Sequence, residues 1–316
     1  MKNSALLGFG AAILDDTALV SDEFLASLPG LRGGAQQVSP AQMQSLLDCL
    51  PQPPLTRLGG AAANTLRAYA GLGGKAGMLT LLGDDQPGKL FLQEMQAAGV
   101  DCRGCKLRAG AKTGRCLSLV SPDGERSMRT LQGVAADMRT EDFCAEDLRG
   151  YSHLFIEGYA LYTPAILRHL LELASENGMC IAYDAGSPEL VSANRELLSG
   201  LLKEFVSIAF FNEPEGLALA AGSSRDEALE KLAGLCDVAV LKLGAEGAWI
   251  SAGGRRVMVP AVKTLALDTT GAGDFWAGAF LYAWMQGQSL AEAGALGARL
   301  AAAVVAQQGC EMPLKF

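Results

Sequence analysis

The chain has 316 residues, of which half are hydrophobic and 19% are charged, so it can bury a large core and is not a disordered polypeptide. Its net charge of −8 and its lack of a Lys/Arg-rich run argue against a nucleic-acid partner. Asp15 and Asp16 break the N-terminal apolar stretch, and the alanine-rich run 296–305 is too short to cross a membrane, so we expect a cytoplasmic protein with no membrane partner.

Strands and helices are predicted to alternate along the first half of the chain. Apolar runs of strand length are followed by helical patterns, and Gly99 is well placed to end the second helix. The expected elements are a strand over 5–14, a helix over 61–70, a strand over 77–82 and a helix over 87–98.

A hairpin interrupts this alternation. The segments 114–121 and 125–130 flank Pro122-Asp123-Gly124, whose residue types favour a tight turn between antiparallel strands. Because a hairpin is foreign to a parallel α/β sheet, we expect a small β appendage built from roughly residues 15–40 and 105–130.

The second half shows the pattern of a parallel sheet covered by helices on both faces. Its predicted strands are near-continuous apolar runs over 153–157, 180–185, 206–211 and 237–243. Helix starts are marked by Thr163-Pro164 and by capping boxes at Ser224 and Ser289, and helices are expected over 274–286 and from 289 to about 308. We therefore predict one three-layer α/β/α domain over 1–316, with a mainly parallel central sheet.

The eight cysteines are scattered, which is typical of reduced thiols in a cytosolic protein. Cys102 and Cys105 form a C-x-x-C pair, for which a metal or redox role stays open. A zinc site would need further ligands, and His153 and His169 are the two histidines of the sequence.

The strongest local signal is Asp268-Thr269-Thr270-Gly271-Ala272-Gly273-Asp274, which leads directly into a predicted helix. Small residues let the backbone approach a ligand closely, and the free amides at a helix N-terminus bind anions. Asp274 then stands where a carboxylate could take a proton from an attacking hydroxyl, as phosphoryl transfer requires. Taken alone, these residues fit an ordinary helix cap after a glycine turn equally well.

Two other nucleotide-binding loops do not match. The sequence has no Gly-x-x-x-x-Gly-Lys-Ser/Thr, and the segment 8–13 lacks the third glycine of a dinucleotide-binding loop. A P-loop enzyme and a standard dehydrogenase are therefore both disfavoured.

The run 268–280 resembles the C-terminal signature of the ribokinase-like, or PfkB, carbohydrate kinases. Further segments resemble motifs of that family and occur in the family's order. They are Gly59-Gly60-Ala61-Ala62-Ala63-Asn64, Leu72-Gly73-Gly74 with Gly83-Asp84-Asp85, Asn212-Glu213-Pro214-Glu215, and Lys242-Leu243-Gly244-Ala245-Glu246-Gly247. The resemblance covers nearly the whole chain and implies the ribokinase-like fold with a small β-sheet lid.

This resemblance implies a role for each matching residue. Asp274 would be the catalytic base, and the amides of Gly271, Ala272 and Gly273 would form an anion hole. Acceptor hydroxyls would be contacted by Asp15, Gly59, Gly60 and Asn64. The nucleotide side would be lined by Lys242, Gly244 and Gly247, and Asn212 and Glu215 would act near Mg²⁺ and the phosphates, largely through water. Some members of the family have a loop that binds a monovalent cation such as K⁺, and Asp268 would lie near that loop.

Several of these residues have plainer explanations. Arg115, in the expected lid, could approach the transferring phosphoryl group or be a solvated hairpin arginine. Asn64 fits a helix cap, Asn212 and Glu215 fit a strand-end turn, and Lys242 fits a surface lysine. Asp184, which ends a buried strand, is a further site candidate.

The acceptor is less well defined. Gly10-x-x-x-x-Asp15 and Pro122-Asp123-Gly124-Glu125-Arg126 resemble the adenosine-kinase-like branch of the family. Ala11 stands where that branch usually has Asn, which removes a side-chain contact to the acceptor. A sugar and another nucleoside therefore both stay open.

We predict an ATP-dependent, Mg²⁺-requiring kinase that phosphorylates a hydroxyl of a small sugar or nucleoside. A catalytically silent sensor of the same fold is the main alternative, and an intact base and anion hole argue against it. A nucleotide-dependent oxidoreductase is disfavoured by the defective glycine loop. Unpaired lid strands would also favour a homodimer, in which pairing covers them.

Overall fold

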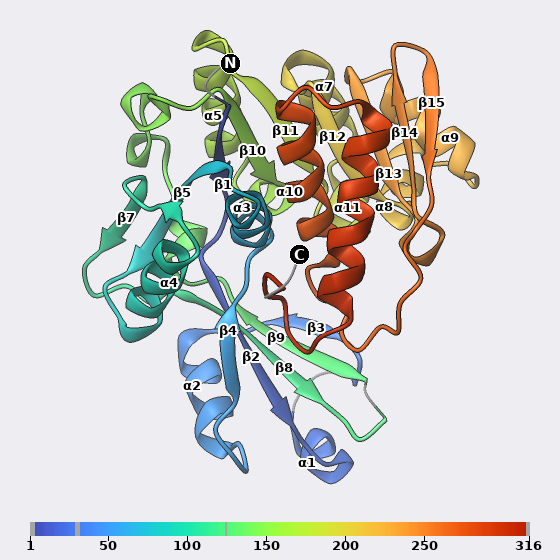
Figure 1. Ribbon diagram of the computed structural model, residues 1–316. Helices are drawn as coiled ribbons and strands as arrows, with labels where there is room; N and C mark the ends of the chain where they lie inside the picture. Colours follow the sequence, from blue (N-terminus) through green and yellow to red (C-terminus); the bar gives the residue numbers. More distant parts are fainter. Residues whose placement is uncertain (1–3, 29–31, 124, 314–316) are drawn as a thin grey trace.

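A large, mainly parallel β-sheet forms the middle layer of the protein (Figure 1). The computed structural model describes residues 4–28, 32–123 and 125–313. In sheet order the strands are β15 (Arg255–Val259), β14 (Ala248–Ala252), β13 (Val238–Lys242), β12 (Ile208–Asn212), β11 (Cys180–Asp184), β10 (His153–Glu157), β1 (Ala5–Phe9), β5 (Lys75–Gly83) and β6 (Val100–Asp101), with β7 (Cys105–Arg108) also paired to β5. The pairs β13–β14 and β14–β15 are antiparallel, and the other neighbours are parallel.

Helices cover both faces of this sheet, as the apolar runs of its strands require. One face packs against α3 (Ala61–Gly71), α4 (Gln86–Ala97), α10 (Ala272–Met285) and α11 (Leu290–Val305). The other packs against α5 (Pro164–Glu176), α6 (Pro188–Ala193), α7 (Arg195–Phe205), α8 (Glu213–Ala220) and α9 (Arg225–Ala233). The predicted three-layer α/β/α architecture is therefore confirmed.

Most predicted elements are present with small shifts at their ends, but two local predictions are wrong. The strand expected over 5–14 is two strands, because the chain leaves the large sheet after Phe9 and enters a second sheet at Ile13. The predicted Thr163 cap of α5 is not formed, since its hydroxyl donates back to the Ala160 carbonyl at 3.4 Å.

The second sheet is a separate five-stranded layer below the carboxyl end of β1 (Figure 1). Its strand order is β3 (Ala35–Gln37), β9 (Arg126–Leu131), β8 (Gly114–Val120), β2 (Ile13–Leu19) and β4 (Leu55–Leu58). The predicted hairpin is β8–β9, and Gly124 of its turn lies outside the described residues. Two short helices, α1 (Asp22–Ser27) and α2 (Pro40–Cys49), cover the outer face with a small apolar cluster.

The bounds expected for this appendage differ from those observed. Residues 105–108 form β7 and pair with β5 in the large sheet, so they do not belong to the small one. Conversely, β4 extends the small sheet beyond residue 40. The register explains the first difference, because β7 continues past β6 along the same edge of β5.

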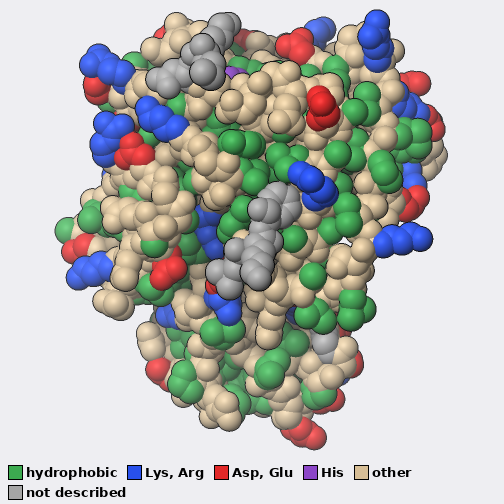
Figure 2. Space-filling view, in the orientation of Figure 1, with side chains coloured by type: hydrophobic (Ala, Val, Ile, Leu, Met, Phe, Trp, Pro, Cys, Tyr) green, Lys and Arg blue, Asp and Glu red, His purple; other side chains and the backbone are tan. Residues whose placement is uncertain are grey.

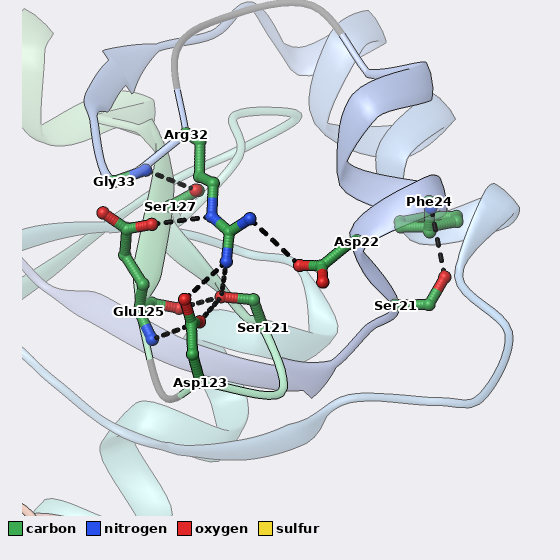
Figure 3. A network of polar contacts seen from close by, with 9 residues as sticks. All are labelled: Ser21, Asp22, Phe24, Arg32, Gly33, Ser121, Asp123, Glu125 and Ser127. Carbon is green, nitrogen blue, oxygen red and sulfur yellow. Dashed lines mark hydrogen bonds and ion pairs between the residues drawn. The ribbon is translucent and has the colours of Figure 1, made fainter.

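Arg32 fastens the tip of the hairpin to the segment before β3 (Figure 3). Its guanidinium lies within 3.1 Å of carboxylate oxygens of Asp22, Asp123 and Glu125. The side chain is 45% exposed, and exposed ion pairs stabilise a fold by roughly 0–1 kcal/mol each. This cluster therefore orders the hairpin tip more than it stabilises the whole fold.

Candidate active site

Glycines bring two buried side chains against the first turn of α10. Gly271 caps the helix with a φ of +69°, and a Cβ there would collide with Cys310 Sγ. A Cβ on Gly273 would lie 3.3 Å from Lys242 Nζ. The turn thus accepts its contact with Cys310 only because Gly271 has no side chain, whereas a Cβ on Gly273 would require a small shift of the Lys242 ammonium.

The amides of this turn are only partly engaged. That of Ala272 donates to the Thr269 carbonyl at 3.3 Å, so it is less available than predicted. Those of Gly271 and Gly273 have no acceptor among the residues the structure describes. Together with the positive end of the helix dipole, these amides favour an anion at the start of α10.

The carboxylate of Asp274 lies at this turn and is held by α3. Its Oδ2 accepts a hydrogen bond of 2.9 Å from Asn64 Nδ2, and its carbonyl accepts one of 3.2 Å from Thr65 Oγ1. Burial, reinforced by Asp184, raises the pKa of Asp274 to about 7, although Asn64 and Lys242 oppose the shift. A carboxylate with that pKa is suited to accept a proton near neutral pH.

A buried ion pair lies beside Asp274, at the carboxyl ends of β11 and β13. Lys242 Nζ donates to Asp184 Oδ2 at 2.7 Å, and their side chains are 13% and 8% exposed. Lys242 is therefore not a surface lysine. Its position next to Gly273 places a positive charge beside the open amides.

Asn212 and Glu215 form a reciprocal cap at the start of α8, beside Lys242. Asn212 Oδ1 accepts from the Glu215 amide at 2.9 Å, and Glu215 Oε2 accepts from the Asn212 amide at 2.7 Å. Burial, with Asp184 adding to it, raises the pKa of Glu215 to about 7, against the effect of Lys242. The pair therefore has a structural function, and the second oxygen of Glu215 remains free for a ligand or water.

The two glycines expected on the nucleotide side lie in the turn after β13. Gly244 and Gly247 have φ values of +58° and +103°. The Leu243 amide donates to the Gly247 carbonyl at 2.7 Å, and a Cβ on Gly247 would collide with the Val259 carbonyl. The turn thus needs Gly247 for its own geometry, whereas Gly244 faces open space.

The small sheet supplies Asp15, which lies against the loop before α3. A Cβ on Gly59 would collide with the Asp15 carboxylate, and Gly60 adopts a φ of +87°. Burial, with Asp16 beside it, raises the pKa of Asp15 to about 7, although Arg67 and Arg126 oppose the shift. The structure therefore brings Asp15, Gly59 and Gly60 together with Asn64 and Asp274.

Arg115 is not brought to this group. Its Nε donates to Asp16 Oδ2 at 2.6 Å, and Asp16 is fully buried. Side chains alternate along a strand, so Asp15 and Asp16 face opposite sides of the small sheet, and Arg115 follows Asp16.

Arg126 is the arginine of the small sheet that reaches the α10 loop. It donates to Asp268 Oδ1 at 2.8 Å and to the Thr270 hydroxyl. Asp268 also accepts from the amides of Thr270 and Gly309, at 2.9 and 3.1 Å. Burial disfavours the charge on Asp268, yet Arg126 and these contacts lower its pKa to about 2.

Sequence analysis missed Glu157, Arg67 and Arg126. Glu157 ends β10, and its carboxylate accepts from the amides of Ala11 and Ala62 at 2.7 and 2.9 Å. Burial raises the pKa of Glu157 to about 7. A carboxylate at the carboxyl end of a buried parallel strand was a visible signal for Glu157. The side that Arg126 faces depends on strand register, which the sequence does not show.

One hollow adjoins this group, and another lies away from it. A cavity of about 150 Å³ lies between the end of β1 and the turn Gly158–Tyr162, and its lining includes Gln37, Gln132, Glu157 and Tyr159. A shallower hollow of about 750 Å³ lies between α5 and α7, away from Asp274. Its Arg168 is paired with Glu172 and Glu204.

Comparison with known proteins decides the family. Residues 51–315 match the family described as pfkB family carbohydrate kinase. The chain belongs to this family. Fructokinase-1 of Oryza sativa subsp. japonica is 32% identical over 71% of this chain and 72% of that protein. The aminoimidazole riboside kinase of Salmonella typhimurium is 29% identical over 71% and 72%.

The solved structure of adenosine kinase from Sinorhizobium meliloti has the same fold as this kinase. It is 32% identical and superposes with a TM-score of 0.88 over 99% of this chain and 96% of that one. The protein is thus a sugar or nucleoside kinase, a phosphotransferase with an alcohol group as acceptor.

No helix in residues 4–28, 32–123 and 125–313 is long and apolar enough to cross a membrane. Nor do those ranges contain three or more His, Cys, Asp or Glu side chains gathered as a metal site, Cys102 and Cys105 included. On the face in Figure 2, acidic and basic side chains are interspersed over the residues drawn in colour.

Proposed function

We propose that this kinase transfers the γ-phosphoryl group of ATP to a hydroxyl of a small sugar or nucleoside, with Asp274 as general base. The observation that carries the proposal is the position of Asp274 at the first turn of α10, beside two open amides and the buried ammonium of Lys242. Phosphoryl transfer needs positioned reactants and stabilised charge, and this turn offers both.

The proposed reaction starts with the acceptor between Asp15 and Asp274. Asp274 takes the proton of the attacking hydroxyl as its oxygen bonds to the γ-phosphorus, while the bond between that phosphorus and the β,γ-bridging oxygen breaks and ADP leaves with the electron pair. The amides of Gly271 and Gly273 and the ammonium of Lys242 stabilise the charge on the transferring group. Each of these groups is fixed by its own contacts, so little reorganisation is required during the reaction.

Mg²⁺ would be held on the nucleotide side by Glu215, largely through water. The donor set fits such a site, because Glu215 has one oxygen outside its capping box and Mg²⁺ keeps several waters and phosphate oxygens as ligands. When bound, the ion would supply positive charge that offsets the negative charge of the phosphates. Asn212 would fix the start of α8, so that Glu215 stays in place.

The 150 Å³ cavity next to Glu157 has a lining that suits a cyclic acceptor, whether a sugar or a nucleoside. Gln37 and Gln132 offer amide groups there, and Phe9 and Tyr159 offer aromatic surface, which together suit a ring with polar edges. The relatives named above act on fructose, aminoimidazole riboside and adenosine, so both sugars and nucleosides belong in the screen.

A screen of ADP release with Mg-ATP over pentoses, hexoses, their acids and ribonucleosides tests this function. We expect acceptor-dependent ADP formation, and a fall in kcat of about 10²–10⁴-fold for Asp274→Asn. Because the raised pKa shows that the fold disfavours the charged carboxylate, Asp274→Asn should not lower the melting temperature. Near-full turnover by this variant would reject Asp274 as the base, and acceptor binding without ADP formation would favour a sensor.

A further inference from the structure

Asn64 and Arg67 lie one turn apart on the same side of α3. Residues three positions apart on a helix are neighbours, and here both side chains are buried, with exposures of 3% and 8%. Gly278 of α10 lies against α3, where a Cβ would collide with the Thr65 carbonyl, so the two helices approach each other closely. Two polar side chains are thereby enclosed between the helices, next to Asp274.

These side chains form a chain of hydrogen bonds that ends on Asp274. Arg67 Nη1 donates to Asn64 Oδ1 at 3.2 Å, and Asn64 Nδ2 donates to Asp274 Oδ2 at 2.9 Å. A guanidinium can only donate and an ionised carboxylate can only accept. The two neighbours therefore leave the Asn64 amide a single orientation, with its oxygen toward Arg67 and its NH₂ group toward Asp274.

Arg67 differs from the other arginines around this site. Arg57, Arg115 and Arg126 pair with Glu311, Asp16 and Asp268, respectively. Arg67 makes its one hydrogen bond within the described residues to Asn64, and its guanidinium lies 5.9 Å from the ring centre of Phe275, the residue after Asp274. Burying a guanidinium without a carboxylate partner lowers the stability of the fold, so the position of Arg67 against Asn64 is better explained by a functional role.

We propose that Arg67 is a positioning residue for the base: it fixes the Asn64 amide, which in turn favours the ionised form of the Asp274 carboxylate and orients it toward the acceptor. This inference rests on the proposed function, in which Asp274 is the base. It also changes the role expected for Asn64, whose contact with Asp274 takes precedence over a contact with acceptor hydroxyls.

The proton affinity of Asp274 is set by several elements besides α3. Groups that face it are Asp184 of β11, Lys242 of β13, Glu157 of β10, Tyr159 of the turn after β10 and Cys310 of the C-terminal segment. Asn64 is the hydrogen-bond donor to its carboxylate, and this bond favours the charged form. Loss of the Asn64 orientation should therefore shift the acidic limb of the pH–rate profile to higher pH.

The hydrogen-bonded chain Arg67–Asn64–Asp274 is called the relay below. A double-mutant cycle with Arg67→Met and Asn64→Ala tests it, using the best acceptor from the ADP-release screen. We expect Arg67→Met to lower kcat by about 10- to 100-fold, to leave KM for Mg-ATP within about twofold, and to move the acidic limb upward. In the Asn64→Ala background, Arg67→Met should lower kcat by less than about twofold, because the relay is already broken. Glu94→Gln is the matched control, since Glu94 is exposed and acts on Arg67 by charge alone.

Equal losses from Arg67→Met in both backgrounds, or an unchanged pH–rate profile, would overturn the relay. If Arg67→Met does not fold, Arg67→Lys provides the same comparison. The lysine of this variant keeps a hydrogen-bond donor for the Asn64 carbonyl oxygen. A pH–rate profile like that of the unmodified protein would therefore support the relay, and a shifted profile would overturn the relay. Asp274→Asn separates the two proposals: full turnover by that variant rejects the base itself, whereas an inactive variant with an additive cycle rejects only the relay.

Discussion

At the scale of single residues, four carboxyl groups around the site share an unusual property. Burial raises the pKa of Asp15, Glu157, Glu215 and Asp274 to about 7. Buried acids that stay partly protonated near neutral pH are typical of sites that move protons. The same arrangement opposes folding once these groups ionise, so function and stability are linked through pH.

The raised pKa values predict that the protein loses stability as the pH rises. A carboxylate whose folded pKa exceeds its unfolded value near 4 stabilises the fold fully below that value, and this contribution disappears as the pH passes the folded pKa near 7. Between pH 5 and 8 the free energy of unfolding should fall, by on the order of 2 kcal/mol for each fully buried group. The lowered pKa of His153 acts in the opposite direction but concerns one group.

Urea unfolding at pH 5, 6.5 and 8 measures this slope. Glu215→Gln is the informative variant, because Gln can still accept from the Asn212 amide in the capping box but cannot titrate. Its free energy of unfolding should depend less on pH than that of the unmodified protein. A free energy that rises from pH 5 to pH 8 would contradict the raised pKa values.

Asp268 leads to a prediction about K⁺. Its Oδ1 accepts from Arg126 and from the Thr270 amide, and its Oδ2 accepts from the Gly309 amide. A monovalent cation at this carboxylate would have to displace a guanidinium. We therefore expect turnover in potassium buffer and in tetramethylammonium buffer to agree within about twofold. A tenfold activation by K⁺ would show that a cation binds this loop in spite of Arg126.

At the scale of elements, the large sheet was predictable and the small one only in part. Apolar runs and capping residues mark strands and helices locally, as in β10 and α9, so the sequence predicted them well. The passage from β1 to β2 has no such signal, because residues 5–14 form one continuous apolar run and the break within it depends on Glu157 holding the Ala11 amide. The same limit affects the site. Arg115 and Arg126 look alike in sequence, and only the register decides which one faces Asp15.

Arg126 joins the small sheet to the α10 loop, and removing it should loosen that loop. In Arg126→Ala, the Asp268 carboxylate loses its ion pair with the guanidinium. The amides of Thr270 and Gly309, which donate hydrogen bonds to this carboxylate, should then exchange hydrogen about tenfold faster. Arg256→Ala is the matched control, since it removes a similarly exposed arginine of the large sheet that pairs with Asp226 and not with Asp268. Equal exchange in the two variants would show that Arg126 does not order the loop.

At the scale of the whole molecule, the small sheet presents an apolar face that its own helices leave uncovered. Leu19, Leu55 and Met128 are 74%, 47% and 38% exposed, and the strand register places them on the same face as Asp15. The helices α1 and α2 pack on the opposite face. We propose that two copies pair through this face, because large exposed apolar side chains on one sheet face are typical of interfaces.

Light scattering at micromolar concentration should therefore give the mass of a dimer, and Leu19→Lys should give that of a monomer, because a buried ammonium without a partner would disfavour the interface. Leu265→Lys is the control, since Leu265 is 79% exposed but lies outside both sheets. The interface would also adjoin the acceptor side of the site, so Leu19→Lys should raise KM for the acceptor more than KM for Mg-ATP. A monomeric mass for the unmodified protein would reject the dimer, and unequal effects on KM in a monomer would point to the small sheet acting within one chain.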